Sequence, residues 1–214
     1  MILALDTSDE IAVCLVARTG TGATVLAARR SAERRRHAEL LAPMIAAVLA
    51  EAAATPQDLT AVVVGTGPAP FTGLRAGLVT ARMLGLALGI GVHGVCSLDA
   101  LAAQAYAAGA AGEVLAVIDA RRREVYAARY RSAAPDVVRV AGPVVDKLVV
   151  VEATMAGGAV VVGPLADPPA GVDPAFLAEL AAVRLARGED LPTTPLYLRR
   201  PDVMPSRTTK RVTG

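Results

Sequence analysis

Residues able to carry acid–base or metal chemistry are few in this sequence and widely spaced. Neither histidine, His37 nor His93, has a second histidine or a cysteine pair at the spacing of metal ligands. No G-x-S-x-G segment places a serine for nucleophilic attack, and neither histidine has a convincing orienting partner. We therefore expect no metal site and assign no catalytic residue.

Two aspartates stand where predicted strands end. Asp6 closes the run ILALD, and Asp119 closes VLAVID. In a two-lobed α/β protein such strand ends face the cleft, where paired carboxylates could hold a magnesium–phosphate. The alternative is that each aspartate caps a turn of its own backbone, and we favour this second interpretation.

A glycine-rich stretch, GTGPAPFTGLRAG, has the layout of a phosphate-binding loop between a strand and a helix. Thr72 is placed to cap that helix, whose N-terminus favours an anion. The P-loop pattern fails, because Leu74 and Arg75 stand in place of Lys and Ser/Thr. Pro68 and Pro70 also remove backbone donors, which favours a rigid turn. The loop residues of interest are Gly65, Gly67, Pro68, Phe71, Thr72 and Gly73.

A mixed α/β pattern must position these residues. Apolar runs predict strands over about 2–6, 11–17, 24–28, 61–65 and 91–95, the first three as an antiparallel meander. Periodicity predicts helices over about 36–54, 73–88 and 97–106, the last with Ser97 as N-cap. The long apolar run 76–92 contains Arg82, Thr80 and glycines, so it indicates a buried helix and not a membrane span.

The second half begins after a Gly-Ala-rich break at 107–112 and, like the first, has a hairpin and a strand that ends in glycine. EVLAVIDARRREVYAARY predicts two strands joined by a charged turn, and 144–152 is ambiguous. A second AVVVG at 159–163 predicts another strand, followed by a helix over 174–187. Two related α/β halves would enclose a cleft.

Two helices carry more apolar or small residues than one core-facing stripe needs. In 36–54, large apolar residues cover about half the circumference. In 73–88, Gly77, Ala81 and Gly85 form a stripe of small residues, although glycine within a helix costs about 1 kcal/mol. Such a stripe permits close approach of another backbone, either within the chain or from a partner helix.

Bulk composition describes a globular chain. Of 214 residues, 54% are apolar and 20% charged, with a net charge of +2. Cys14 and Cys96 lie far apart and no basic leader precedes ILALDTS, so we expect a reduced, cytoplasmic protein. Arginine runs at 34–36, 121–123 and 199–200 are typical of solvated faces, and would form a phosphate track only on a shared face.

Five ordered motifs resemble the TsaB (YeaZ) family: ILALDTS, HAELLAPMI, GTGPAPFTGLRAG, IDARRREVYAARY and PLYLRRPD. They cover most of 1–131 and the C-terminal segment, whereas 132–192 match loosely. The resemblance implies the α/β fold of actin-like ATPases (ASKHA, ribonuclease H-like), with two subdomains that each have a mixed sheet flanked by helices. We expect subdomains at 1–108 and 109–200, with 193–200 able to return to the first, and a flexible tail over 201–214.

The resemblance also implies a function. The family member is a non-catalytic subunit that pairs with TsaD and works with TsaE to transfer threonylcarbamoyl to the tRNA adenosine beside the anticodon. It reaches tRNA through that complex and has no membrane association. A further interpretation, compatible with this one, is a homodimer that uses the same helices when TsaD is absent. No tightly bound cofactor is expected, and ATP or ADP would bind only within the assembled complex. The alternative is an enzyme on the same fold, either a small-molecule kinase or a glycoprotease-like peptidase.

Site residues follow from the same resemblance. The family's interface helices match 37–54 and 73–88, which predicts a partner interface of His37, Leu40, Leu41, Met44, Gly77, Leu78, Ala81, Arg82 and Gly85. A vestigial nucleotide cleft would contain Asp6, Thr7 and Asp119. TsaD carries His-x-x-x-His after its counterpart loop, whereas this chain has His93 alone. Ala69 and Pro70 also depart from the family loop G-P-G-S-F-T-G.

Overall fold

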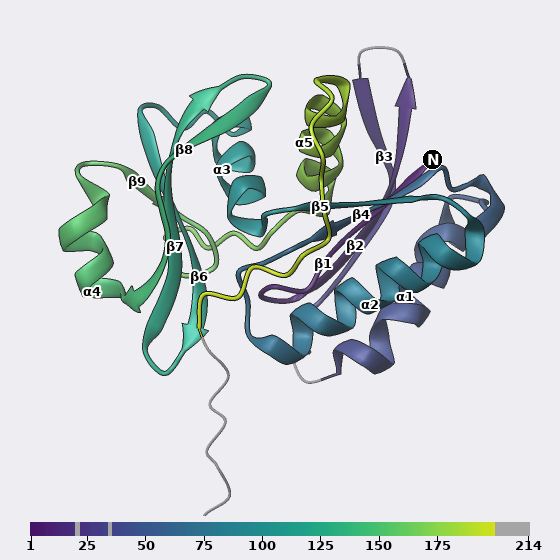
Figure 1. Cartoon of the computed structure of the whole chain (residues 1–214), viewed down its shortest axis with the longest axis horizontal. Helices are drawn as coiled ribbons and strands as arrows, with labels where there is room; N and C mark the ends of the chain where they lie inside the picture. Colours follow the sequence, from purple (N-terminus) through teal and green to yellow (C-terminus); the bar gives the residue numbers. More distant parts are fainter. Residues whose placement is uncertain (20–21, 34–35, 200–214) are drawn as a thin grey trace, which may run out of the picture.

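The computed structural model describes residues 1–19, 22–33 and 36–199 (Figure 1). Two sheets stand side by side with helices between and outside them. The predicted flexible tail, 201–214, lies outside the described residues. The α/β architecture predicted from the sequence is therefore present, with a mixed sheet in each half.

The first sheet has the order β3-β2-β1-β4-β5. Its strands are β1 (Ile2–Asp6), β2 (Ile11–Thr19), β3 (Gly22–Ser31), β4 (Ala61–Gly65) and β5 (Gly91–Val95). The predicted meander is confirmed, because β1 pairs antiparallel with β2, and β2 with β3. β4 and β5 continue the sheet in parallel, which places the C-terminal ends of β1, β4 and β5 at one edge.

The second sheet has the order β8-β7-β6-β9. Its strands are β6 (Glu113–Arg121), β7 (Glu124–Ala133), β8 (Asp136–Lys147) and β9 (Val160–Val162). The ambiguous segment 144–152 divides at Lys147, where β8 ends and the short helix α4 (Leu148–Val151) begins. A π-helical turn (Glu152–Ala156) follows.

Five layers result from the placement of the helices. α1 (His37–Glu51) and α2 (Phe71–Leu88) cover the outer face of the first sheet. α3 (Ser97–Ala107) and α5 (Pro174–Ala186) lie between the sheets, and α4 covers the far face of the second (Figure 1). A 3-10 turn (Pro56–Asp58) precedes β4.

Successive side chains of a strand point to opposite faces of the sheet, and so pack in different layers. Leu3 and Leu5 of β1 point to the α1–α2 layer, whereas Ala4 points to the central layer. Of the β6 residues, Leu115 packs in the α4 layer and Ala116 in the centre. Alanine is frequent in the central core, which lets α3 pack closely on the second sheet and α5 on the first.

The helices cross the predicted boundary between 108 and 109. α3 packs on the second sheet, whereas α5, which we expected in the second subdomain, packs on β1, β2, β4 and β5 of the first. The following segment also returns to the first sheet, since Gly94 N donates to Leu191 O and Leu196 N to Thr66 O. Whether the chain divides as 1–108 and 109–200 stays a prediction.

Two predicted caps are wrong. Cys96 is the N-cap of α3, and the Ser97 hydroxyl instead donates to Asp6 in the first sheet. Pro70 is the N-cap of α2, so Thr72 lies inside the first turn and caps nothing. At α3, the Ser97 hydroxyl binds the buried Asp6 carboxylate in place of a backbone N–H of the helix. At α2, the helix begins directly after Pro70, two residues earlier than a cap at Thr72 would allow.

α2 is also less buried than its apolar sequence predicts. Among the described residues it is the one helix long and apolar enough to cross a membrane by length and composition. Its inner face packs on the first sheet, while Val79, Met83 and Leu86 are 55%, 58% and 78% exposed. α2 is therefore an amphipathic helix whose outer side is apolar and uncovered.

Candidate functional site

Asp6 sits at the C-terminal edge of β1 and is almost fully buried. Its Oδ1 accepts from Ser8 N at 2.7 Å and from the Ser8 hydroxyl, and its Oδ2 accepts from Ser97 Oγ at 2.6 Å. Burial raises the pKa of Asp6, although these hydrogen bonds oppose the rise. Both oxygens are therefore engaged inside the protein, with Ser97 as a partner that the sequence did not reveal.

Asp119 plays the corresponding part in the second sheet. Its Oδ1 accepts from Arg121 N and its Oδ2 from Arg121 Nη1, each at 2.8 Å. Asp6 and Asp119 thus each accept from the backbone two residues ahead, which is the turn-capping role we favoured. A magnesium–nucleotide would need these carboxylates to exchange those partners, so the donor set does not fit such a group in this conformation.

Thr7 and His37 pack against the start of α2. Thr7 Oγ1 donates to Gly73 O at 2.9 Å. An ideal Cβ on Gly73 would lie 2.8 Å from His37 Nε2 and 2.9 Å from Thr7 O, so only glycine fits. His37 Nε2 is buried without a hydrogen-bond partner among the described residues, and burial lowers the pKa of His37.

The glycine-rich loop is held by the same interior contacts. A Cβ on Gly65 would overlap Asp6 Oδ2. Gly67 has φ +86°, and its carbonyl accepts from Ser97 N at 2.8 Å. Pro68 is buried, and Phe71 begins α2 directly after Pro70. The glycines therefore serve close packing around Asp6 and His37, as a rigid turn would require.

Most of the predicted partner interface faces inward. Gly77, Leu78, Ala81 and Gly85 form the buried side of α2. A Cβ on Gly77 would overlap Thr7, and one on Gly85 would overlap the Val92 side chain. In this structure the small-residue stripe accommodates the chain's own sheet, and the assignment of these four residues to a partner interface stays a prediction.

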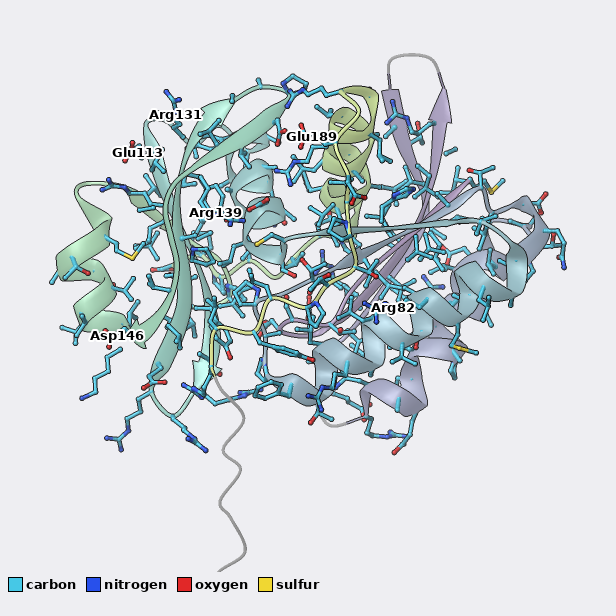
Figure 2. The ribbon with its side chains drawn as sticks, in the orientation of Figure 1. Arg82, Glu113, Arg131, Arg139, Asp146 and Glu189 are labelled. Carbon is cyan, nitrogen blue, oxygen red and sulfur yellow. The ribbon has the colours of Figure 1, made fainter. Side chains whose placement is uncertain are left out.

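The remaining predicted interface residues divide between two surroundings. His37 and Leu41 are buried in the layer between α1 and the sheet. Leu40 and Met44 are half-buried against the same core, at the rim of α1. Arg82 is exposed on α2 (Figure 2). Its Nε donates to Thr193 Oγ1 and its Nη2 to Thr193 O.

The C-terminal segment occupies the arginine face of α2. Arg75 Nε donates to the Tyr197 hydroxyl at 2.9 Å, and the Tyr197 ring lies 4.7 Å from that of Phe71. Arg75 also stacks over both rings. Arg75 and Arg82, which are two turns apart on α2, thus both bind the C-terminal segment of the same chain.

The outer row of α2 is the uncovered apolar surface of this region. We use the name outer row for Val79, Met83 and Leu86, which recur at i, i+4 and i+7 and so lie on one face. Beside it, an apolar groove of about 210 Å³ runs between α1 and α2. The groove is lined by Ala42, Ile45, Ala46, Leu49, Pro56, Leu59, Thr80 and Leu84. The i, i+4, i+7 spacing was visible in the sequence.

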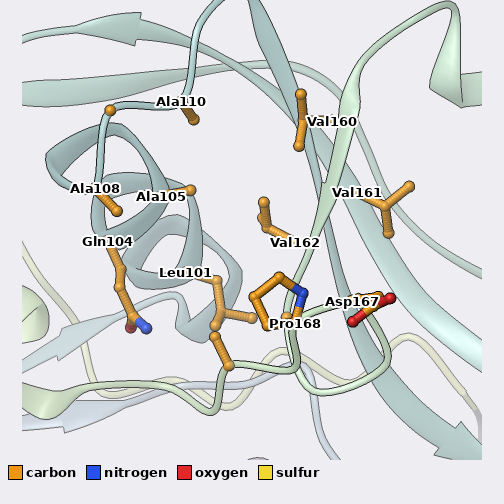
Figure 3. A pocket seen from close by; sticks show the side chains of 13 residues that line it. Leu101, Gln104, Ala105, Ala108, Ala110, Val160, Val161, Val162, Asp167 and Pro168 are labelled. Carbon is orange, nitrogen blue, oxygen red and sulfur yellow. The ribbon is translucent and has the colours of Figure 1, made fainter.

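A larger groove of about 420 Å³ lies elsewhere, between α3 and β9 (Figure 3). Its walls are mostly apolar, with Gln104 and Asp167 as the polar side chains. Gln104 Oε1 is engaged, since it accepts from Asp173 N at 3.1 Å. None of the predicted site residues lines this groove.

The part of the chain that the structure describes contains no cluster of metal ligands and no reactive thiol. There, no three His, Cys, Asp or Glu side chains gather as metal ligands would. Cys14 and Cys96 are free and buried, and burial raises the pKa of each thiol to about 12. Thiols with such pKa values are protonated at neutral pH and poorly reactive.

Comparisons with known proteins agree on one relationship. The family model "TsaD: tRNA N6-adenosine threonylcarbamoyltransferase" matches residues 25–183. TsaB of Escherichia coli, a tRNA threonylcarbamoyladenosine biosynthesis protein, is 36% identical over 130 residues, which is 61% of this chain and 54% of that protein. An uncharacterized protein of Mycobacterium tuberculosis is 44% identical over 95% of this chain and 94% of its own.

Solved structures extend the match to nearly the whole chain. YeaZ from Pseudomonas aeruginosa superposes with a TM-score of 0.76 at 28% identity, covering 92% of this chain and 99% of that one. A second Pseudomonas aeruginosa structure, described as similar to peptidase YeaZ, gives the same TM-score at 30% identity.

Proposed function

Because the chain belongs to the TsaB (YeaZ) family and carries a domain of the TsaD type, we propose that it is the non-catalytic subunit that pairs with TsaD. Its fold is the actin-like (ASKHA) fold of the YeaZ structures. With TsaD and TsaE it would support transfer of threonylcarbamoyl to the tRNA adenosine beside the anticodon, in the cytoplasm. Homodimers would form when TsaD is absent.

The observation that carries this proposal is the outer row beside the α1–α2 groove. Val79, Met83 and Leu86 are more than half exposed on a helix whose inner face is already packed. Adjacent exposed apolar residues that border an apolar groove are typical of a helix–helix contact with a partner. Leu40 and Met44, at the rim of α1, would complete that contact; Arg82 would border it while bound to Thr193.

A non-catalytic role is supported by the engagement of the polar residues. Asp6 and Asp119 are both occupied by nearby hydrogen-bond donors, and His37 is enclosed by α1, Thr7 and Gly73. We further propose that the isolated chain binds no cofactor tightly, and that ATP or ADP binds only in the complex. The cleft of Asp6, Thr7 and Asp119 would then be a remnant.

Co-purification with TsaD from the same bacterium tests the proposed interface. We expect Met83→Glu/Leu86→Glu to reduce co-purified TsaD at least about tenfold, since two carboxylates would be buried without partners. Thermal unfolding of the isolated chain should change little, because both residues are exposed. Cells with this variant as the only copy should lose threonylcarbamoyladenosine from tRNA.

The matched control is Val149→Glu, which introduces a charge at a 68% exposed valine on α4, beyond the second sheet (Figure 1). It should co-purify TsaD like the unmodified chain. Normal recovery of TsaD by the α2 double variant would show that the outer row is not the interface.

A further inference from the structure

The β6–β7 hairpin ends in three consecutive arginines whose backbone is left-handed. Arg121, Arg122 and Arg123 have φ values of 64°, 57° and 63°. Arg121 pairs with Glu124, so Arg122 and Arg123 are the two central residues of the turn. Such turns need positive φ at both centres and usually take Asn-Gly, because a Cβ is disfavoured there. Arginines therefore occupy positions where the backbone favours glycine or asparagine.

Neighbouring contacts hold the tip in this conformation. Arg121 is bound through its N–H and its guanidinium to Asp119. Arg199 donates to Ala120 O at 3.1 Å and pairs with Glu124. Arg122 and Arg123 lie beyond these anchors and are exposed. A strained backbone that neighbouring residues hold in place is common at functional sites.

Positive charge prevails at this end of the second sheet. Within the described part of the chain, the paired strand ends and Arg199 bring together the basic residues Arg121, Arg122, Arg123, Lys147 and Arg199 and the acidic residues Asp119, Glu124 and Asp146. Figure 2 shows Asp146 at this end, and Arg131 with Glu113 at the opposite end. Of the other two arginine runs, 34–36 and 199–200, only Arg36 and Arg199 lie within the described residues.

We propose that the Arg122–Arg123 turn contacts the phosphate backbone of tRNA. The inference rests on the proposed function, which supplies the RNA. Guanidinium groups match phosphate oxygens in charge and geometry, and a backbone contact needs no apolar surface. A protein partner would need a buried apolar centre, which a two-residue arginine turn does not offer.

Binding of a transcribed, fluorescently labelled tRNA to the chain in complex with TsaD tests this contact. Arg122→Asn/Arg123→Gly keeps the turn but removes both charges. We expect the Kd to rise about tenfold at 0.1 M salt, and the slope of log K against log salt to become shallower by about 1.5. The thermal midpoint of the isolated chain should rise, because the new residues suit the turn.

Two controls separate charge from strain and from position. Arg122→Lys/Arg123→Lys keeps charge and strain and should keep most of the affinity and the salt slope. Arg18→Gln/Arg131→Gln removes two exposed arginines elsewhere and should weaken binding less than twofold.

Three outcomes would overturn the inference. The Asn-Gly variant could bind tRNA normally, or it could weaken binding no more than the Arg18/Arg131 control. It could also lose TsaD while the isolated chain binds tRNA unchanged, which would make the tip a protein contact. The proposed function fails separately, if the unmodified chain neither binds TsaD nor supports the tRNA modification.

Discussion

At the scale of single residues, the polar side chains and glycines around Asp6 make hydrogen bonds and close contacts with one another. Asp6 accepts from Ser8 and Ser97, and Thr7 donates to Gly73. Position 65 has no room for a side chain, because a Cβ there would overlap the Asp6 carboxylate. Sequence spacing identified Asp6, Thr7 and Gly65 as special positions, but the partner Ser97 is 91 residues from Asp6 and only folding brings them together.

Gly77→Ala tests this interior packing. The new methyl would gain about 1 kcal/mol in helix propensity but would overlap Thr7 Oγ1 and lie 3.3 Å from its Cγ2. Overpacking typically costs 1–3 kcal/mol, so we expect a net loss of about 1–2 kcal/mol in the free energy of unfolding, measured by urea titration. In a Thr7→Ala background the same substitution should be neutral or stabilising. An equal loss in both backgrounds would contradict the proposed contact.

At the scale of elements, the three sides of α2 have different surroundings. Its glycine side lies on β1 and β5, its arginine side binds the C-terminal segment, and its outer row is uncovered. The sequence predicted where this helix lies but assigned the glycine side to a partner. Periodicity reports that a helix has an apolar face, yet on a helix with two such faces it does not report which one the sheet covers.

Tyr197→Ala tests the attachment of the C-terminal segment to α2. Loss of the ring beside Phe71 and of the hydrogen bond from Arg75 should cost about 1 kcal/mol, a modest amount because Tyr197 is 39% exposed. Amide exchange at Leu196, whose N–H donates to Thr66 O, should accelerate. Tyr197→Phe keeps the ring and should lose less than half as much. Unchanged exchange at Leu196 in Tyr197→Ala would show that the ring does not hold this segment.

At the scale of the molecule, a buried ionic cluster joins the two halves. Asp99 of α3 accepts from Tyr130, Arg139 and Arg184 at 2.6–2.9 Å. Arg184 of α5 also pairs with Asp136 of β8, at 2.9 Å. α5 packs on the first sheet, so Arg184 connects that sheet to the second through α3 and β8.

Arg184→Met tests this connection, because it keeps the stem and removes the charge. Two mostly buried carboxylates would lose a partner, so we expect the free energy of unfolding to fall by about 3 kcal/mol at pH 7. Arg187→Met removes the half-exposed end of the same cluster and should cost under about 1 kcal/mol. Equal losses in the two variants would show that burial does not set the strength of this cluster.

The ion pair between Arg184 and Asp136 predicts that the stability of the protein depends on pH. Burial alone would raise the pKa of Asp136, but the hydrogen bonds and charges of Arg184 and Arg187 hold it below its usual value. A depressed pKa in the folded state adds stability above the unfolded value of 3.8, and that stability is lost as pH falls through the folded pKa. The difference between the unmodified chain and Arg184→Met should therefore shrink from about pH 5 to pH 3.

The sequence by itself determined the family and, apart from β8 and α4, the order of strands and helices, because these follow from ordered motifs and local patterns. It allowed turn capping by Asp6 and Asp119 as one of two interpretations. Tertiary structure alone decided that α5 returns to the first sheet and that the glycine stripe faces inward. It also decided that the 121–123 arginines adopt left-handed backbone at a hairpin tip. These depend on which surfaces compete for burial and on which anchors hold a turn, and contacts between residues far apart in the chain settle both.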